Sequence, residues 1–193
     1  MSSSLALLLA LSVPTDRFEL SEALPLTERI VMVHIVEGRV LHHQRGQKRD
    51  SERVEILPLD VAMAGRPESW TVSSADDPDF SAGLRPQKVG RKSKGTGFAW
   101  MVQGWDPAKN RVANRDPDHV KSHWLYLVLP RAMKPGKRYA VRAEGVKGLA
   151  FLEFEGPGKS TRSEAVHVNL LGYLPDAPAK YAYVYHWAGD LGS

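Results

Sequence analysis

The sequence predicts an all-β protein, in which an antiparallel β-sandwich is followed by a second, incomplete sandwich. Three observations lead to this fold class. Short segments with alternating apolar and polar residues recur along the chain, and turns rich in Pro and Gly separate them. No segment longer than about ten residues keeps a helical period. Many short strands with turns between them are typical of two antiparallel sheets packed face to face.

From Arg17 onward the chain is rich in predicted strands, and the first with defined bounds begins at residue 28. Residues 28–37 and 39–43 are predicted to form a hairpin that turns at Gly38. Residues 52–59 are predicted to be a strand that Pro58 ends. Because proline cannot donate to a sheet ladder, Pro58 places this segment at a sheet edge or at a strand end. Asp-Pro chemistry predicts a turn at residues 76–79. The remaining predicted strands of this sandwich cover residues 69–73, 98–105, 123–129, 138–143 and 149–155.

The C-terminal stretch carries the most regular strand pattern of the chain. Residues 164–178 read EAVHVNLLGYLPDAP, in which a short alternating strand over 165–169 is followed by a Gly-Tyr corner and two prolines. Residues 179–187, AKYAYVYHW, alternate strictly. Because strand side chains point to opposite faces in turn, one face carries four aromatic residues, Tyr181, Tyr183, Tyr185 and Trp187.

Composition shifts divide the chain into four parts. Residues 156–163 are rich in Gly, Pro and Ser and lack apolar side chains, which indicates a linker. We therefore expect a β-sandwich domain over residues 16–155 and the first strands of another domain over 164–193. A sandwich of the immunoglobulin type needs about seven strands and about 100 residues. The second domain is accordingly predicted to be truncated, as part of a longer polypeptide.

The segment VHVNLLGYLPDAPAKYAYV resembles the opening of the immunoglobulin-like domain that precedes the catalytic barrel in cellulase-type glycoside hydrolases of family nine. That family has an extended segment of the form V-x-V-N-Q-x-G-Y-x-P, followed by a turn with Pro or Lys. Leu170 departs from the pattern, since the family usually has Gln there. The positions that fit are Val166, Val168, Asn169, Gly172, Tyr173, Pro175 and the turn over 178–180.

The resemblance implies that this chain is the non-catalytic N-terminal portion of a cellulase-like hydrolase that degrades β-glucan. Its role would be to support a downstream catalytic module of the same polypeptide, and its partners would be that module and β-glucan. In that family the catalytic acid and base lie on the barrel, so no catalytic residue is carried onto this sequence. The chain alone is therefore expected not to be an enzyme and to use no cofactor.

Composition and charge limit which cellular compartment and which partners are expected. The chain is 42% hydrophobic and 25% charged, which is typical of soluble globular proteins. It has no cysteine, which excludes disulfides and thiolate metal sites. The formal charge of +4 is modest, so neither a nucleic acid nor a membrane is expected as a partner. Leu5–Leu11 suits the apolar core of a signal peptide, so residues 1–15 are predicted to be a signal peptide or a disordered N-terminus, and the protein secreted or periplasmic.

Candidate metal sites are each weaker than an ordinary structural explanation. His119 and His123 have the spacing of two zinc ligands on a helix, but on a strand they would lie about 13 Å apart. The adjacent His42 and His43 would point to opposite faces of a strand. Two groups of aspartates lack the ligand spacing of a calcium loop, and no metal ligand is assigned. These groups are Asp76, Asp77 and Asp79, and Asp106, Asp116 and Asp118.

Two further motifs are incomplete. Residues 90–97, GRKSKGTG, form a basic, glycine-containing segment without the ending of a phosphate-binding loop, so a solvated loop is expected. The chain has no Gly-x-Ser-x-Gly motif and no cysteine, so the sequence gives no support for a hydrolytic triad.

Tryptophans supply the one binding hypothesis. Aromatic rings stack on the apolar faces of sugars, so an exposed tryptophan on a β-sandwich could bind a glycan. Trp100 and Trp124 lie within apolar strands and are expected in the core. Trp105, beside Gly104 and Asp106, is the candidate for glycan stacking. The alternative function is therefore a stand-alone carbohydrate-binding module.

Overall fold

The computed structural model describes residues 16–41, 53–100, 105–112, 118–149, 151–159, 161, 165–169 and 171–192. Side-chain positions are not described for 53, 99, 100, 105, 106, 111, 112 and 118. The elements in chain order are β1 (Leu20–Thr27), β2 (Ile30–Val36), β3 (Gly38–Leu41), β4 (Arg53–Ile56), α1 (Val61–Ala64), η1 (Pro67–Ser69), β5 (Trp70–Ser73), η2 (Pro78–Phe80), β6 (Lys88–Trp100), β7 (Trp105–Asp106), β8 (Arg111–Val112), β9 (Asp118–Val128), β10 (Arg138–Ala143), β11 (Phe151–Glu155), β12 (Val166–Val168), β13 (Ala182–Val184) and η3 (Gly189–Leu191).

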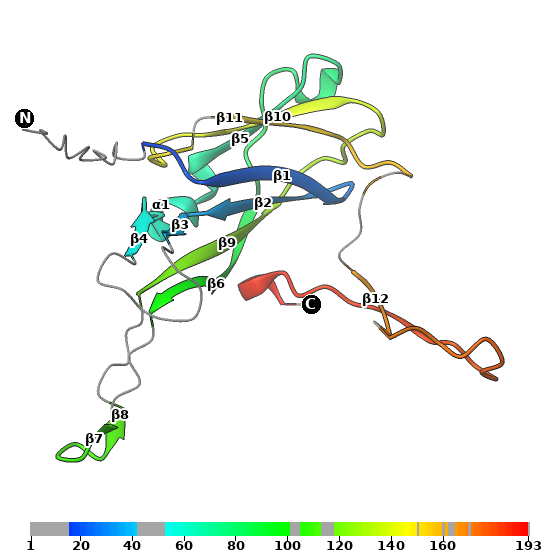
Figure 1. The fold of residues 1–193 in the computed structure, drawn as a ribbon. Helices are drawn as coiled ribbons and strands as arrows, with labels where there is room; N and C mark the ends of the chain where they lie inside the picture. Colours follow the sequence, from blue (N-terminus) through cyan, green and yellow to red (C-terminus); the bar gives the residue numbers. More distant parts are fainter. Residues whose placement is uncertain are drawn as a thin grey trace, which may run out of the picture.

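Two antiparallel sheets form what we call the body of the molecule. One has four strands in the order β1-β2-β9-β6, and the other has three in the order β11-β10-β5. Figure 1 shows the three-stranded sheet above the four-stranded one. Strands dominate and every pairing between named strands in the described part of the chain is antiparallel, so the predicted all-β fold class is confirmed.

The hydrophobic core lies between these two sheets. On β2 and β9 alternate side chains point inward, as the two-residue period of a strand requires. Trp70 is fully buried, and its Nε1–H donates to the carbonyl oxygen of Ala64 at 2.8 Å, so its polar atom is satisfied. The buried residues from both sheets are Val31, Val33, Ile35, Leu125 and Leu127 on one side and Trp70, Val72, Tyr139, Val141 and Phe154 on the other.

The predicted hairpin at Gly38 is wrong. β2 pairs with β1 and β9, whereas β3, which begins at Gly38, pairs with β4. The reason is that Gly38 lies against the β4 backbone, where an added Cβ would be 2.0 Å from the carbonyl oxygen of Glu55. The glycine thus permits close contact between strands rather than a reversal of the chain. The hairpin partner of β2 is β1, a strand that the sequence did not reveal.

The basic segment over residues 90–97 is also not a loop. It forms the middle of β6, a strand of 13 residues that runs along β9 from Lys88 to Trp100 with interruptions in the pairing. Two irregularities in the pairing register accompany this stretch, one between Gly95 and Gly97 and one between Phe98 and Trp100. Glycine and lysine have low strand propensity, so here pairing along β9 overrides local preference.

Other predicted strands agree with the structure. β5, β9, β10 and β11 lie where the sequence placed strands, and β4 ends before Pro58. Trp124, however, is not part of the core, because it points to the outer face of the four-stranded sheet. There its ring stacks on His34, with centroids 4.8 Å apart, and is only half-buried. The side chain of Trp100 lies outside the described part of the chain.

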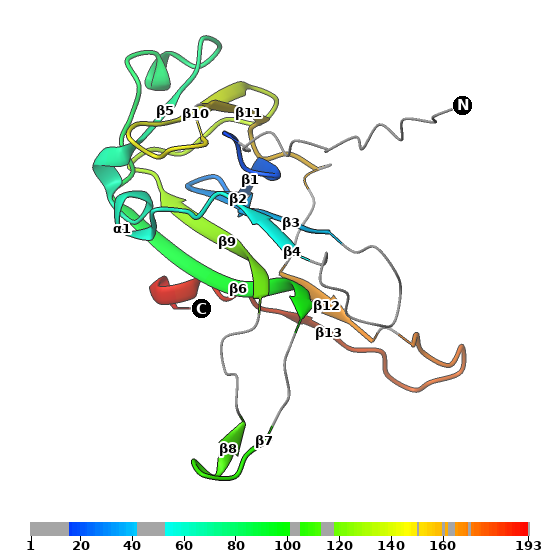
Figure 2. The same ribbon diagram turned by 60° about the vertical axis from the view of Figure 1, so that its left-hand side comes forward.

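Two hairpins extend from the body. β7 and β8 pair with each other through Trp105 and Asp106, and β12 pairs with β13 over three residues. Figure 2 shows both hairpins projecting away from the two sheets. We call residues 165–185, which include β12, β13 and the loop between them, the ribbon.

Candidate functional site

The ribbon is the most exposed apolar surface of the described chain. Its aromatic face carries Tyr181, Tyr183 and Tyr185, which are 63%, 64% and 59% exposed. Its opposite face carries Val166, Val168 and Val184, and Val184 is 76% exposed. Large apolar patches on a soluble protein mark contact surfaces, because water-exposed apolar area is unfavourable. Both faces of this hairpin are therefore candidates for contact with another surface.

The residues that carry the family resemblance define the loop of the ribbon. The side-chain oxygen of Asn169 accepts from Leu171 N at 3.0 Å, and Asn169 O accepts from Gly172 N at 3.1 Å. Gly172 has φ of 83°, a conformation that favours glycine. The Tyr173 hydroxyl donates to the carbonyl oxygen of Tyr181 and so joins the two sides of the loop. Each of these residues thus contributes a hydrogen bond or a backbone conformation to the shape of the loop.

The strand part of the ribbon is held by one histidine. The His167 ring stacks on Tyr185 with centroids 4.1 Å apart, and its Nε2–H donates to Tyr185 O at 3.1 Å. The backbone of Tyr185 also donates to Ala165 O at 2.9 Å. A two-stranded hairpin alone is only marginally stable in water. These contacts order the ribbon without covering it.

The chain after the ribbon returns to the body. Asp190 accepts a hydrogen bond from Arg91 N at 2.6 Å, which occupies a free backbone donor at the edge of β6. The side chain of Leu191 packs directly on Gly90. A Cβ added at residue 90 would lie 2.3 Å from Leu191 Cγ, so only glycine fits at residue 90. The His186 ring meets the buried Tyr126 edge to face at 5.5 Å. We call residues 186–192 the latch; Figure 1 shows it beside β6.

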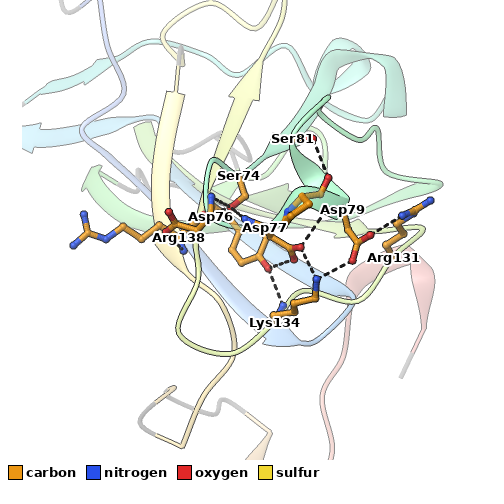
Figure 3. Close-up of polar contacts among 10 residues, drawn as sticks. Ser74, Asp76, Asp77, Asp79, Ser81, Arg131, Lys134 and Arg138 are labelled. Atoms are coloured by element: carbon orange, nitrogen blue, oxygen red, sulfur yellow. Dashed lines mark hydrogen bonds and ion pairs between the residues drawn. The ribbon is translucent and has the colours of Figure 1, made fainter.

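A polar cluster lies on the body, at the predicted Asp-Pro turn. The structure forms this turn as a bend followed by η2. Asp77 is fully buried there, and its Oδ1 accepts from Lys134 Nζ at 2.7 Å while its Oδ2 accepts from the Tyr139 hydroxyl at 2.8 Å. Lys134 Nζ also donates to Asp79 Oδ2 at 2.9 Å. Figure 3 shows the lysine between the two carboxylates, with Arg131 on the far side of Asp79.

The charges in this cluster shift one another's pKa values. Hydrogen bonding to Lys134 holds the pKa of Asp77 and of Asp79 below the ordinary value, because it stabilises the ionised carboxylates. The same pairs raise the pKa of Lys134. Burial, together with the hydrogen bond to Asp77, raises the pKa of Tyr139 to about 12.

This cluster fits a structural role. A cleft of about 470 Å³ lies beside it, lined by Arg29, Arg131 and Lys134 among others. Each of these cations already has a partner, since Arg29 donates to Pro130 O, Arg131 to Asp79, and Lys134 to Asp77 and Asp79. The lysine ammonium also occupies the position between carboxylates that a calcium ion would need. The cluster therefore connects η2 to the loop before β10.

The two histidines considered as zinc ligands contact different residues. His119 and His123 both lie on β9, but His119 stacks on Phe98 whereas His123 is buried against Glu37. Across the described residues, no three His, Asp or Glu side chains gather as a metal site would require. His42, His43, Asp116 and the N-terminal 15 residues lie outside the described chain.

Trp105 is placed only by its backbone. It begins β7 in the hairpin that projects from the body, but its side chain lies outside the described part, so glycan stacking by Trp105 stays a prediction. Among the residues that the structure describes, no helix is long and apolar enough to cross a bilayer.

Comparison with protein-family models, with curated proteins and with solved structures gave no match for this chain. The family resemblance of the ribbon therefore stays a prediction that depends on the ribbon's own residues.

Proposed function

We propose that this chain is a non-catalytic N-terminal portion of a cellulase-like glycoside hydrolase and supports a downstream catalytic module. In this proposal residues 165–185 form the first strands of an immunoglobulin-like domain. The remaining strands of that domain pack on the ribbon, and the domain in turn braces the module that cleaves β-glucan. The body contributes stability and a second contact surface, and it does not itself cleave the glycosidic bond.

The observation that carries this proposal is the exposure of both faces of the ribbon. A sheet of this kind normally buries at least one face, because three or more strands or a packed partner are needed for independent stability. Val184 and Tyr183, on opposite faces of the same strand, are 76% and 64% exposed. Further strands would bury the valine face, and a neighbouring domain would cover the tyrosines.

The test compares this chain with a longer polypeptide. We expect the reading frame after Ser193 to continue into further strands and a catalytic barrel. In the longer product, Tyr183 and Tyr185 should then be protected from hydroxyl-radical oxidation, while Phe98 of the body should react equally in both. An in-frame stop followed by unrelated DNA would contradict the proposal, as would equal oxidation of the ribbon tyrosines in the two polypeptides.

A second candidate function is carbohydrate binding by the exposed aromatic residues. The row Tyr181, Tyr183 and Tyr185 is favoured by its exposure, and Trp105 by its place on a projecting hairpin. Retention on insoluble cellulose should then be weakened by Tyr183→Ala or by Trp105→Ala. Tyr139→Phe, in the buried cluster, is the matched control and should leave retention unchanged. Absence of retention on a broad glycan panel removes this candidate.

A further inference from the structure

Three side chains far apart in the sequence form a hydrogen-bonded chain at one end of the four-stranded sheet. Ser93 on β6 and His123 on β9 are directly paired in the ladder, and Ser93 Oγ lies 2.8 Å from His123 Nδ1. On the other side of the ring, His123 Nε2 lies 3.1 Å from Oε2 of Glu37, which follows β2. A hydroxyl, an imidazole and a carboxylate are thus joined in series.

The hydrogen-bond partners fix where the protons lie. Glu37 already accepts from the backbone N–H groups of Lys121 at 3.2 Å and Leu59 at 3.4 Å. Its carboxylate can only accept, so His123 Nε2 carries the ring proton and donates it to Glu37. Nδ1 then carries the lone pair that can accept a hydrogen bond. Arg91 donates to Ser93 Oγ at 2.6 Å, which leaves the serine proton directed at Nδ1.

Burial sets the state of the imidazole. His123 and Glu37 are 3% and 5% exposed, whereas Ser93 is exposed to solvent. Burial lowers the pKa of His123 below its ordinary value, the nearby cations Arg91 and Lys121 lower it further, and Glu37 acts in the opposite direction. The ring is therefore neutral at pH 7, which is the form that can accept a proton.

A buried histidine needs a partner on each ring nitrogen, and Ser93 meets that need. What this arrangement adds is a reactive hydroxyl that faces water while its base is oriented from inside the fold. A nucleophile within hydrogen-bond reach of a base, which is in turn held by a third group, is the arrangement of nucleophilic catalysis. None of the three residues lies in a local sequence motif, so only the sheet brings them together.

We propose that Ser93 is an activated nucleophile that takes an acyl group from small carboxylic esters. Ser93 Oγ attacks the ester carbonyl carbon, and its proton passes to His123 Nδ1. The tetrahedral intermediate then collapses, and the leaving alkoxide takes that proton from Nδ1. Water attacks the acyl-serine, again losing its proton to Nδ1, which returns it to Ser93 as the carboxylic acid is released. No oxidant or cofactor is needed.

Two residues assist without reacting. Glu37 is a positioning residue, because it holds the ring in the tautomer with the proton on Nε2 and stabilises the imidazolium that forms. Arg91 donates a positively charged N–H to Oγ, where it stabilises the negative charge that develops as the serine proton moves to His123. The inference goes beyond the proposed supporting function and does not depend on it. That function calls the chain non-catalytic toward the glycosidic bond, whereas the bond cleaved here is an ester.

Covalent labelling tests the nucleophile directly. The full chain is incubated with an alkyl fluorophosphonate, which phosphonylates activated serine hydroxyls with loss of fluoride, and the labelled peptide is identified by mass spectrometry. We expect the label on Ser93 and its loss in Ser93→Ala. Ser81→Ala removes another exposed serine hydroxyl, one that donates to Pro78 O instead of a histidine, and should label like the wild type. No label, or a label elsewhere that persists in Ser93→Ala, overturns the inference.

Hydrolysis of p-nitrophenyl acetate tests the roles of His123 and Glu37. The rate should fall as the pH is lowered through the pKa of His123, which lies below the ordinary value of 6.5, because protonated His123 cannot accept the serine proton. Glu37→Gln should lower the rate at least tenfold, because an amide can donate to Nε2 and so favour the wrong tautomer. Thermal unfolding of Glu37→Gln is measured alongside. If the folded variant keeps the wild-type rate and pH profile, Glu37 does not position the base, and the inference is wrong.

Discussion

β9 and β13 are alike in sequence and opposite in environment. Both alternate large apolar and aromatic residues, HWLYLV in one and YAYVYHW around the other. Leu125 and Leu127 of β9 are fully buried between β2, β6 and the three-stranded sheet, whereas all three residues of β13 are exposed. Alternation thus specifies a strand in both cases. Burial depends on whether neighbouring strands are available, which alternation does not report.

The largest expected effect comes from removing a buried side chain of β9. Leu127→Ala should lower the free energy of unfolding by about 2–5 kcal/mol, because it leaves a cavity between the two sheets. Val184→Ala on β13 is the matched truncation and should change it by less than about 0.5 kcal/mol, because Val184 is already exposed. Urea unfolding followed by tryptophan fluorescence measures both. Equal losses would show that the ribbon is packed in solution.

A smaller effect is expected from the buried polar cluster of the body. Tyr139→Phe removes the hydroxyl that donates to Asp77 Oδ2 and accepts from Lys134 N. Leaving these buried groups without a partner should cost about 1–3 kcal/mol in urea unfolding. Tyr183→Phe removes an exposed hydroxyl of the ribbon and should have no measurable effect. A neutral Tyr139→Phe would mean that water replaces the lost hydroxyl.

The third effect is confined to acid. Since Lys134 holds the folded-state pKa of Asp77 below the unfolded value of 3.8, the unfolded chain binds more protons in this range. The resulting stability is present above that value and is lost as the pH falls through the folded-state pKa. Asp77→Asn should therefore make the free energy of unfolding depend less steeply on pH between about 2 and 5. Parallel curves for the variant and the wild type would contradict this assignment.

The smallest effect concerns the latch that joins the ribbon to the body. Asp190→Ala removes the acceptor of Arg91 N. The free energy that holds the latch on the body should fall by about 0.5–1.5 kcal/mol. The sensitive measurement is amide hydrogen exchange at Arg91, which should become about threefold to tenfold faster. Asp176→Ala, in the exposed loop of the ribbon, is the matched control. Unchanged exchange at Arg91 in Asp190→Ala would show that the latch does not protect β6.

Local patterns predicted much of the strand content. Alternation located β9, β10 and both strands of the ribbon, and Pro58 marked the end of β4. The same reasoning failed for β6, where glycines and lysines predicted a loop. A strand of low propensity forms there because β9 offers a ladder of backbone partners, and local composition does not contain that information.

The sequence by itself determined the fold class, most strand positions and the shape of the ribbon loop, because alternation, proline and glycine act over a few residues. Only the tertiary structure decided which strands pair, so that β2 joins β1 and β9 instead of β3. It also brought Ser93, His123 and Glu37 into one hydrogen-bonded chain. These residues are far apart in the sequence, and they meet only because the three segments that carry them lie side by side in the fold. Contacts between distant segments depend on the packing of the whole fold, and short-range patterns cannot encode them.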